Sequence, residues 1–170
     1  AAVILASEKV ARRYTDTPIW IAASAQSSDT LALHDRESLT GLKASVIAGK
    51  EAFKQASLSP KDIQVAELHD CFTIGEIMAV EDLGFVKKGE GGKAMDQGMF
   101  ELGNKLSTNT SGGLKGCGHP VGATGVKQAV EIVKQLRGQA GERQVKGAEI
   151  GLTHNVGGSG ATAVVHIMRR

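Results

Sequence analysis

Three short segments hold the residues whose types and spacing could carry chemistry. Each presents a histidine: His69 in "HDCF", His119 in "GGLKGCGHPVGATG" and His154 in "THNVGGSG". The first two segments also hold the only cysteines of the chain, Cys71 and Cys117. Imidazole and thiol together are typical of acyl chemistry, in which a thiolate acts as nucleophile or base and the imidazole moves a proton.

Zinc binding is the second interpretation of these five side chains, because imidazole and thiolate are both good zinc ligands. The H-x-C and C-x-H pairs lack the C-x2-C spacing of structural zinc sites, so we expect no metal. The other two histidines carry weaker signals. His34 stands in a polar segment and is expected at the surface, and His166 stands in an apolar run and is expected in the core.

Cys71 is expected on the turn between a strand and a helix. Residues 64–69, "QVAELH", predict the strand, and Thr73 and Glu76 fit the T-x-x-E capping box, which predicts a helix beginning at Thr73. The N–H groups at a helix N-terminus stabilise a thiolate. A reactive thiol and an inert cysteine beside a structural histidine are equally consistent with this position.

The glycine-rich run, residues 112–125, leads into a helix expected at about residues 123–137. Glycines let backbone N–H groups approach a ligand closely, and Pro120 stiffens the backbone after His119. A histidine presented to an active site is therefore favoured over a plain crossover loop. The helix is expected to bury one apolar face, made of Val126, Ala129, Val130, Val133 and Leu136.

The third segment joins two predicted strands, residues 148–155 and 161–168. The N–H groups of the "VGGSG" turn between them could bind an oxyanion, and a plain hairpin turn is the alternative. A formal G-x-G-x-x-A match in this segment is not a dinucleotide fingerprint, because a strand follows it rather than a helix.

The remaining pattern indicates one layered α/β domain without repeats or linkers. Buried strands are also predicted at residues 1–6 and 19–25, and helices at residues 7–14, 39–57 and 58–63, with Ser7 and Ser59 as N-caps. In such folds, functional groups gather at strand ends. The first residues are apolar and do not begin with Met, which suggests a piece of a longer chain.

The composition argues against several functional classes. A net charge of +2 with interspersed signs, and 4% aromatic residues, do not suit a nucleic-acid groove. The longest apolar stretch is far shorter than a membrane span. Two cysteines make no disulfide framework and no signal peptide is visible, so we expect a reducing, cytoplasmic location.

The order and spacing of "HDCF", "GGLKGCGHPVGATG" and "HNVGGSG" resemble the C-terminal half of thiolases. The likeness covers essentially the whole chain and is greatest to archaeal acetyl-CoA acetyltransferases and sterol-carrier-protein-type thiolases, also called nonspecific lipid-transfer proteins. It implies a thiolase-like layered α/β fold, in which residues 1–170 form the C-terminal domain, a mixed five-stranded sheet with helices on both faces. It also implies reversible Claisen condensation and thiolysis of acyl-CoA, with the coenzyme A thioester as substrate and no separate cofactor.

The resemblance implies roles for the first two motifs. His119, flanked by Gly118 and Pro120, matches the G-H-P histidine that activates the nucleophile and donates to a thioester oxygen. His69 stands where many thiolases have an asparagine beside the first oxyanion hole. Cys71 matches the thiol of H-D-C-F thiolases that removes the Cα proton of the second substrate.

The third motif is implied to complete the site. Gly157 or Gly158 would supply a backbone N–H to the second oxyanion hole. His154 is counted with the catalytic residues and stands where other thiolases have the cysteine of a C-x-G motif, so that the acid/base thiol cannot lie there. Cys117, two residues before His119, remains an alternative to Cys71.

The family's nucleophilic cysteine belongs to an N-terminal half, and no segment of this sequence matches its motif. The isolated chain is therefore expected to be inactive. The implied partners are an acyl-CoA substrate, the N-terminal half, further copies in a homo-oligomer, a hydroxymethylglutaryl-CoA (HMG-CoA) synthase and a small OB-fold acyl-CoA-binding protein. Neither nucleic acid nor a membrane is an expected partner. A non-catalytic acyl-CoA-binding, lipid-binding or scaffold module is the alternative.

Overall fold

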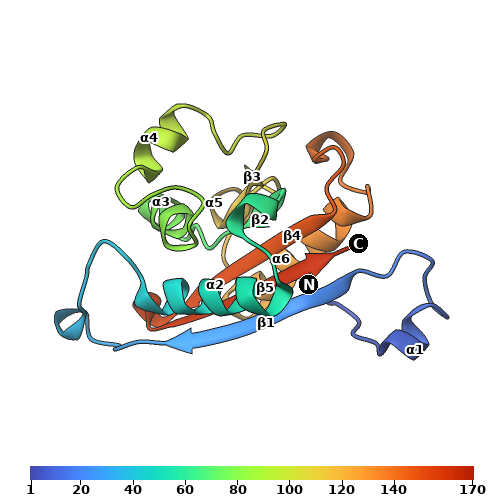
Figure 1. The fold of residues 1–170 in the computed structure, drawn as a ribbon, viewed down its shortest axis with the longest axis horizontal. Helices are drawn as coiled ribbons and strands as arrows, with labels where there is room; N and C mark the ends of the chain where they lie inside the picture. The colour runs from blue at the N-terminus through green and yellow to red at the C-terminus, as the bar shows by residue number, and fades with distance from the viewer.

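The computed structural model describes all 170 residues around one five-stranded sheet (Figure 1). The strands are β1 (Trp20–Ser28), β2 (Val65–Glu67), β3 (Ser107–Thr108), β4 (Ile150–Gly157) and β5 (Thr162–Arg169), and their order in the sheet is β1-β5-β4-β2-β3. The β1–β5 and β5–β4 pairs are antiparallel, whereas β2 runs parallel to both β4 and β3. The expected mixed sheet is confirmed.

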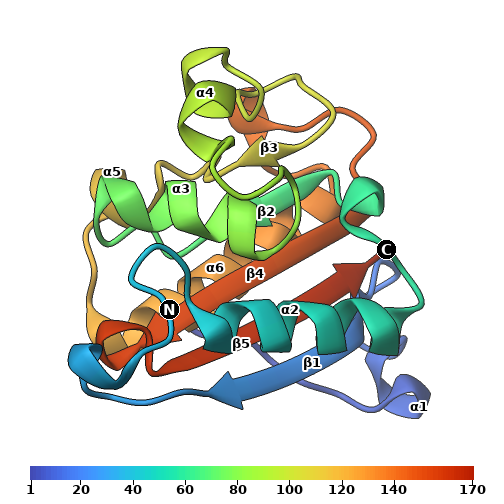
Figure 2. The ribbon, with the colours of Figure 1, turned by 60° about the vertical axis from the view of Figure 1, so that its left-hand side comes forward.

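Helices cover both faces of this sheet, as expected. The helices α2 (Lys43–Ala56) and α3 (Thr73–Asp82) lie on one face, and α6 (Val121–Leu136) lies on the other (Figure 2). Shorter helices are α1 (Glu8–Ala11), α4 (Gly91–Asp96) and α5 (Gly113–Cys117), and single 3-10 turns are Leu33–Asp35 (η1), Pro60–Asp62 (η2), Gly141–Arg143 (η3) and Gly158–Gly160 (η4). None of the helices has the length and apolar character needed to cross a membrane.

Small side chains bring the layers close together. On one face, α2 buries Ala44, Ala48 and Ala52 in the larger apolar core, which also contains residues of β1, β4 and β5. On the other face, Ile132 of α6 is fully buried against β4, where a Cβ on Gly151 would stand only 2.6 Å from it. These contacts fix both helix layers on the sheet, because neither could approach if the small residues were larger.

The expected extents of three N-terminal and connecting elements are wrong. Residues 1–6 form no strand, and Ile4 and Leu5 are 95% and 76% exposed, because this segment finds no strand edge with which to pair. The predicted helix at residues 58–63 is only the 3-10 turn Pro60–Asp62, and the helix at residues 7–14 shortens to α1, without a side-chain cap from Ser7.

The capping box predicted at Thr73 does not form, although α3 does begin at Thr73. The Glu76 carboxylate instead accepts a hydrogen bond of 2.7 Å from the Thr108 hydroxyl of β3. A long-range partner thus replaces the local one that the T-x-x-E pattern predicts.

Helix α6 also differs in the face that it buries. Its most buried residues are Thr124, Gln128, Glu131, Ile132, Gln135 and Leu136, and the other apolar residues of the predicted face are only half-buried. The polar side chains are buried because they bond to neighbouring loops. Gln135, for example, donates to the Arg143 carbonyl at 2.7 Å and accepts from the Val145 N–H at 2.8 Å.

The parallel pairing of β2 with β4 gathers the three motifs at one end of the sheet. Glu67 pairs with Thr153, so the residues that follow the two strands emerge at the same edge. The start of α3, the short helix α5 and the start of α6 lie at this edge, on the left of Figure 2. The sequence led us to expect the motifs at strand ends, and the parallel pairing of β2 with β4 explains why they share one edge.

Candidate active site

His69 and His119 lie against each other at this edge. His69 follows β2 and is 5% exposed, and His119 lies in the exposed loop between α5 and α6. Their ring centroids are 4.9 Å apart and their planes meet at 87°, an edge-to-face contact. Burial lowers the pKa of His69, and the neighbouring His119 lowers it further. His69 is therefore a neutral hydrogen-bonding group at pH 7.

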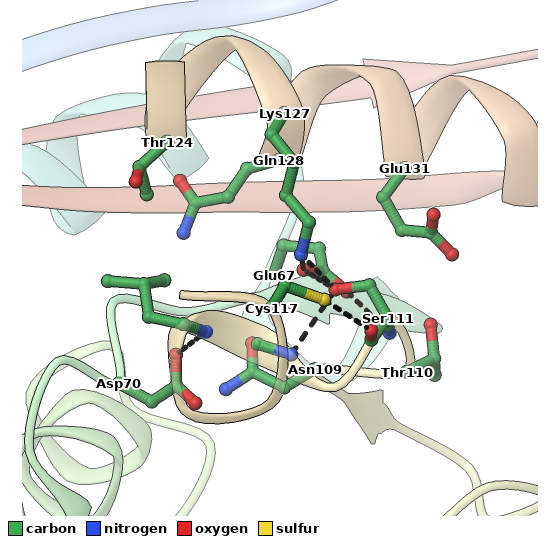
Figure 3. Close-up of polar contacts among 12 residues, drawn as sticks. Glu67, Asp70, Asn109, Thr110, Ser111, Cys117, Thr124, Lys127, Gln128 and Glu131 are labelled. Carbon is green, nitrogen blue, oxygen red and sulfur yellow. Dashed lines mark hydrogen bonds and ion pairs between the residues drawn. The ribbon is translucent and has the colours of Figure 1, made fainter. Parts of the chain in front are cut away.

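Asp70 connects the loops that carry these two histidines. Its buried carboxylate accepts hydrogen bonds from the backbone N–H groups of Leu114 (2.7 Å) and Lys115 (3.4 Å) in α5 (Figure 3). Gly113 packs against the same carboxylate, and a Cβ there would lie 2.2 Å from Oδ2 of Asp70. Asp70 thereby sets the distance between the "HDCF" turn and the glycine-rich loop.

Thr124 fixes the tautomer of His119. The Thr124 hydroxyl donates to the Pro120 carbonyl at 3.2 Å and lies 2.7 Å from Nδ1 of His119. A hydroxyl has one hydrogen, and we infer that the Pro120 carbonyl accepts it, which leaves Nδ1 as the donor in the shorter bond. The neutral ring then carries its lone pair on Nε2, which is the form that can take a proton from a thiol.

The other predicted residues belong to the loops that carry these two histidines or to the end of β4. Cys71 is half-buried and immediately precedes Phe72, the N-cap of α3. Gly118 has a left-handed φ of 81°, and Pro120 is the N-cap of α6, so both shape the backbone around His119. Gly157 and Gly158 are exposed at the end of β4.

His154 lies beneath the surface, on β4. It is 1% exposed, its Nε2 is 2.8 Å from the Ser45 hydroxyl of α2, and its Nδ1 has no partner. Burial, followed by the nearby His69, lowers the pKa of His154 to about 3. The side chain is thus neutral and shielded from solvent, and its catalytic role remains a prediction.

We expect His154 to make the folded chain less stable in acid. Between pH 6.5 and about 3 the unfolded chain binds a proton at this residue that the folded chain does not. The free energy of unfolding should therefore fall as the pH drops through this window, by up to about 1.4 kcal/mol per pH unit. His69, whose pKa is also lowered, contributes in the same direction. Urea unfolding at a series of pH values measures this slope.

Replacing His154 with Gln should flatten the slope, because the amide can still bond Ser45 but does not titrate. His34→Gln is the matched control, since the His34 side chain is 84% exposed. An unchanged slope in His154→Gln would show that the acid sensitivity comes from other groups.

A second polar cluster anchors the glycine-rich loop from below (Figure 3). Glu67 is fully buried, and its carboxylate accepts from the Ser111 hydroxyl at 2.6 Å and from the Ser111 N–H at 3.2 Å. Lys127 of α6 lies 3.5 Å from the same carboxylate and also donates to the Ser111 hydroxyl. Burial raises the pKa of Glu67, whereas the Ser111 bonds and the Lys127 charge favour the carboxylate.

Cys117 belongs to this second cluster. Its thiol donates to the Ser111 carbonyl at 3.0 Å, and its sulfur points toward Ser111 in Figure 3. The five side chains of the alternative zinc set are not gathered as ligands, since no group of three or more His, Cys, Asp or Glu residues is placed to hold a metal ion. The His69–His119 pair is therefore the part of this edge whose side chains can carry out acid/base chemistry.

Several residues of the site were missed from the sequence. Asp70 stands inside "HDCF", and Thr124 stands in the "GATG" that follows the G-H-P segment, so the motifs contained a signal for both. No sequence signal pointed to Ser45 or Lys127. Ser45 contacts His154, which is 109 residues away, and the partners of Lys127 are 16 or more residues away. Such pairs are visible only after the chain has folded.

Comparison with known proteins places the chain among thiolases and their relatives. The family described as thiolase C-terminal domain-like matches residues 25–170. The acetyl-CoA acetyltransferase of Methanothermobacter thermautotrophicus is 59% identical over 170 residues, which are 100% of this chain and 44% of that protein. Human sterol carrier protein 2 is 40% identical over 169 residues, 96% of this chain and 31% of its own length. The chain thus spans less than half the length of these curated relatives.

Solved structures give the same picture of the fold. The Ltp2-ChsH2(DUF35) aldolase matches 95% of this chain and 42% of its own, with a TM-score of 0.85 and 28% identity. A monomeric SCP2-thiolase like protein from Mycobacterium smegmatis matches 95% of this chain and 32% of its own, with a TM-score of 0.68 and 19% identity. The second likeness concerns the fold alone.

Proposed function

Because the chain belongs to the thiolase C-terminal domain-like family, we propose that it supplies the acid/base and oxyanion-binding groups of a thiolase-type acyltransferase. The proposed reaction is reversible Claisen condensation and thiolysis of acyl-CoA. The nucleophilic cysteine would come from outside these residues. The observation that carries the proposal is the contact between His69 and His119, whose loops are joined by the Asp70 carboxylate, with Cys71 in the same loop as His69.

The types of the residues at this edge suit the condensation step. The nucleophilic cysteine would already hold an acyl group as a thioester, and coenzyme A would have left. Cys71, as thiolate, takes the Cα proton of acetyl-CoA, and the resulting carbanion attacks the acyl carbon. A carbon–carbon bond forms and the carbon–sulfur bond breaks, which releases 3-oxoacyl-CoA and the enzyme thiolate. The proton remains on Cys71 until the next cycle.

The two histidines and the glycine turn serve the oxygens in this scheme. His69 and His119 donate to thioester oxygens on which negative charge develops, and a backbone N–H of Gly157 or Gly158 does the same at the second hole. For His119 this requires the protonated ring, which forms when Nε2 takes the proton of the nucleophilic thiol. His154, buried behind His69, would act by positioning it.

The test is Cys71→Ala in the natural protein, meaning this chain together with the part that supplies the nucleophilic cysteine. We expect the exchange of the acetyl-CoA Cα protons with deuterated water to slow by about 100-fold, because the base is removed. Formation of the acyl-enzyme, followed by mass spectrometry, should persist. Cys117→Ala is the matched control, since Cys117 bonds the Ser111 carbonyl in the other cluster.

The outcomes separate the alternatives. Loss of exchange in Cys117→Ala instead of Cys71→Ala would transfer the acid/base role to Cys117. Binding of acyl-CoA by the unmodified protein without any exchange or acyl-enzyme would favour a non-catalytic acyl-CoA-binding, lipid-binding or scaffold module over the enzyme.

Aldol chemistry is the second candidate, and the similarity to the Ltp2-ChsH2(DUF35) aldolase favours it. An aldolase also needs a base and an oxyanion site, but it transfers no acyl group to a thiol. Carbon–carbon cleavage of a 3-hydroxyacyl-CoA without acyl-enzyme formation would identify this activity.

We propose acyl-CoA as the ligand and a multi-component assembly as the setting. One solved relative is the Ltp2-ChsH2(DUF35) aldolase, and its name, which joins Ltp2 with ChsH2, supports a second protein acting together with this chain. An HMG-CoA synthase, an OB-fold acyl-CoA-binding protein and further copies of the thiolase are the proposed components.

A further inference from the structure

We propose that Arg36 is a positioning residue for the glycine turn at the end of β4, an inference that rests on the proposed function. Arg36 lies in the segment that follows β1, far from the three motifs in sequence. Its guanidinium donates to the Ser159 carbonyl at 2.6 Å through Nη1. It also donates to the Thr30 carbonyl through Nε at 3.3 Å and through Nη2 at 3.2 Å.

The turn that Arg36 holds has an unfavourable backbone. Gly158, Ser159 and Gly160 all have a positive φ, at 49°, 46° and 92°. Ser159 carries a side chain in this left-handed region, which only glycine adopts without strain. Such a conformation persists when neighbouring groups over-determine it, and the bond from Arg36 to the Ser159 carbonyl is charge-assisted.

The segment around Arg36 encloses the turn from several sides. A Cβ on Gly160 would lie 2.5 Å from Leu42 and 3.2 Å from Nη1 of Arg36. On Gly158, a Cβ would lie 3.5 Å from Leu31. The Asp29 N–H donates to the Ala161 carbonyl at 2.7 Å. The turn is thus clamped between the segment of residues 29–42 and the end of the sheet.

This clamp matters because an oxyanion hole works only when its N–H groups are preorganised. The Ser159 carbonyl belongs to the turn that begins at Gly157 and Gly158, the proposed donors. One peptide plane separates it from the plane of the Gly158 N–H, so holding this carbonyl restricts rotation within the short turn that begins at the donors. We infer that the planar, forked guanidinium is required, because it reaches both the Thr30 and the Ser159 carbonyl at once, whereas an ammonium is a point donor.

The experiment compares Arg36→Lys and Arg36→Ala with the unmodified natural protein in steady-state thiolysis of acetoacetyl-CoA. We expect Arg36→Lys to lower kcat about tenfold with KM changed less than threefold, because the donors are displaced in the transition state. Added guanidinium at a non-denaturing concentration should restore part of the kcat of Arg36→Ala. Arg137→Lys is the matched control, since Arg137 donates to the Thr17 carbonyl at 2.9 Å in another part of the fold.

The outcomes distinguish this inference from the proposed function. An unmodified protein without acyl-transfer activity would overturn the proposed function and the role of Arg36 with it. An active protein whose Arg36→Lys variant keeps its kcat would overturn the positioning role alone. The same would hold if Arg137→Lys lost as much kcat, because the effect would then be a general consequence of cutting an arginine–carbonyl bond.

Discussion

Replacing His119 with Asn in the natural protein is expected to lower kcat of thiolysis by about 10³-fold. General acid–base groups contribute roughly 10²- to 10⁴-fold, and His119 is proposed to act both on the nucleophile and on a thioester oxygen. Asn is the sharpest substitution because its amide nitrogen can replace Nδ1 as the donor to Thr124. It provides nothing in place of Nε2. Stopped-flow assay of acyl-enzyme formation should locate the loss in the acylation step.

Two variants of Thr124 test the reason given for this loss. Thr124→Val removes the hydroxyl that accepts from Nδ1 of His119, so the tautomer with a free Nε2 is no longer favoured. Thr124→Ser keeps the hydroxyl. We expect Thr124→Val to lose about tenfold in kcat and Thr124→Ser to retain most of it. Equal activities of the two variants would show that Thr124 does not set the tautomer.

The layers and the place of the site followed from local patterns in the sequence. Strands at residues 19–25, 148–155 and 161–168 were predicted from short apolar runs, and all three lie in the sheet. The sequence placed two motifs at strand ends and the glycine-rich motif on a loop before a helix, but it did not predict which strands run parallel. The parallel pairing of Glu67 with Thr153 is the contact that brings the motifs to one edge.

What the sequence could not reveal depends on partners distant in the chain. The apolar residues at 1–6 have the composition of a strand, but a strand also needs a neighbour to accept its hydrogen bonds. The polar face of α6 looks unsuited to burial until Gln135 and Lys127 are seen with their partners. Asp70 reads as part of a motif, and only its bonds to α5 show that it joins two loops.

The contact between the Asp70 carboxylate and α5 should also make the largest contribution to the stability of the site. The variant Gly113→Ala tests this. The residue has a φ of 60°, which costs an alanine about 1–2 kcal/mol. The new Cβ would also lie 2.2 Å from the Asp70 carboxylate and displace it from its N–H donors, which costs about 1.5–3 kcal/mol. We therefore expect the free energy of unfolding of the chain to fall by about 2.5–5 kcal/mol, measured by urea unfolding.

A matched glycine and a double-mutant cycle identify the cause. Gly116 lies in the same short helix with open space around it, so Gly116→Ala should leave the stability unchanged or raise it by up to about 1 kcal/mol. Asp70→Ala removes the carboxylate that the new methyl group meets. In the Asp70→Ala background, Gly113→Ala should therefore cost only the backbone strain, about 1–2 kcal/mol. If the cost of Gly113→Ala stayed the same with and without Asp70, the carboxylate would not be the contact that joins the two loops.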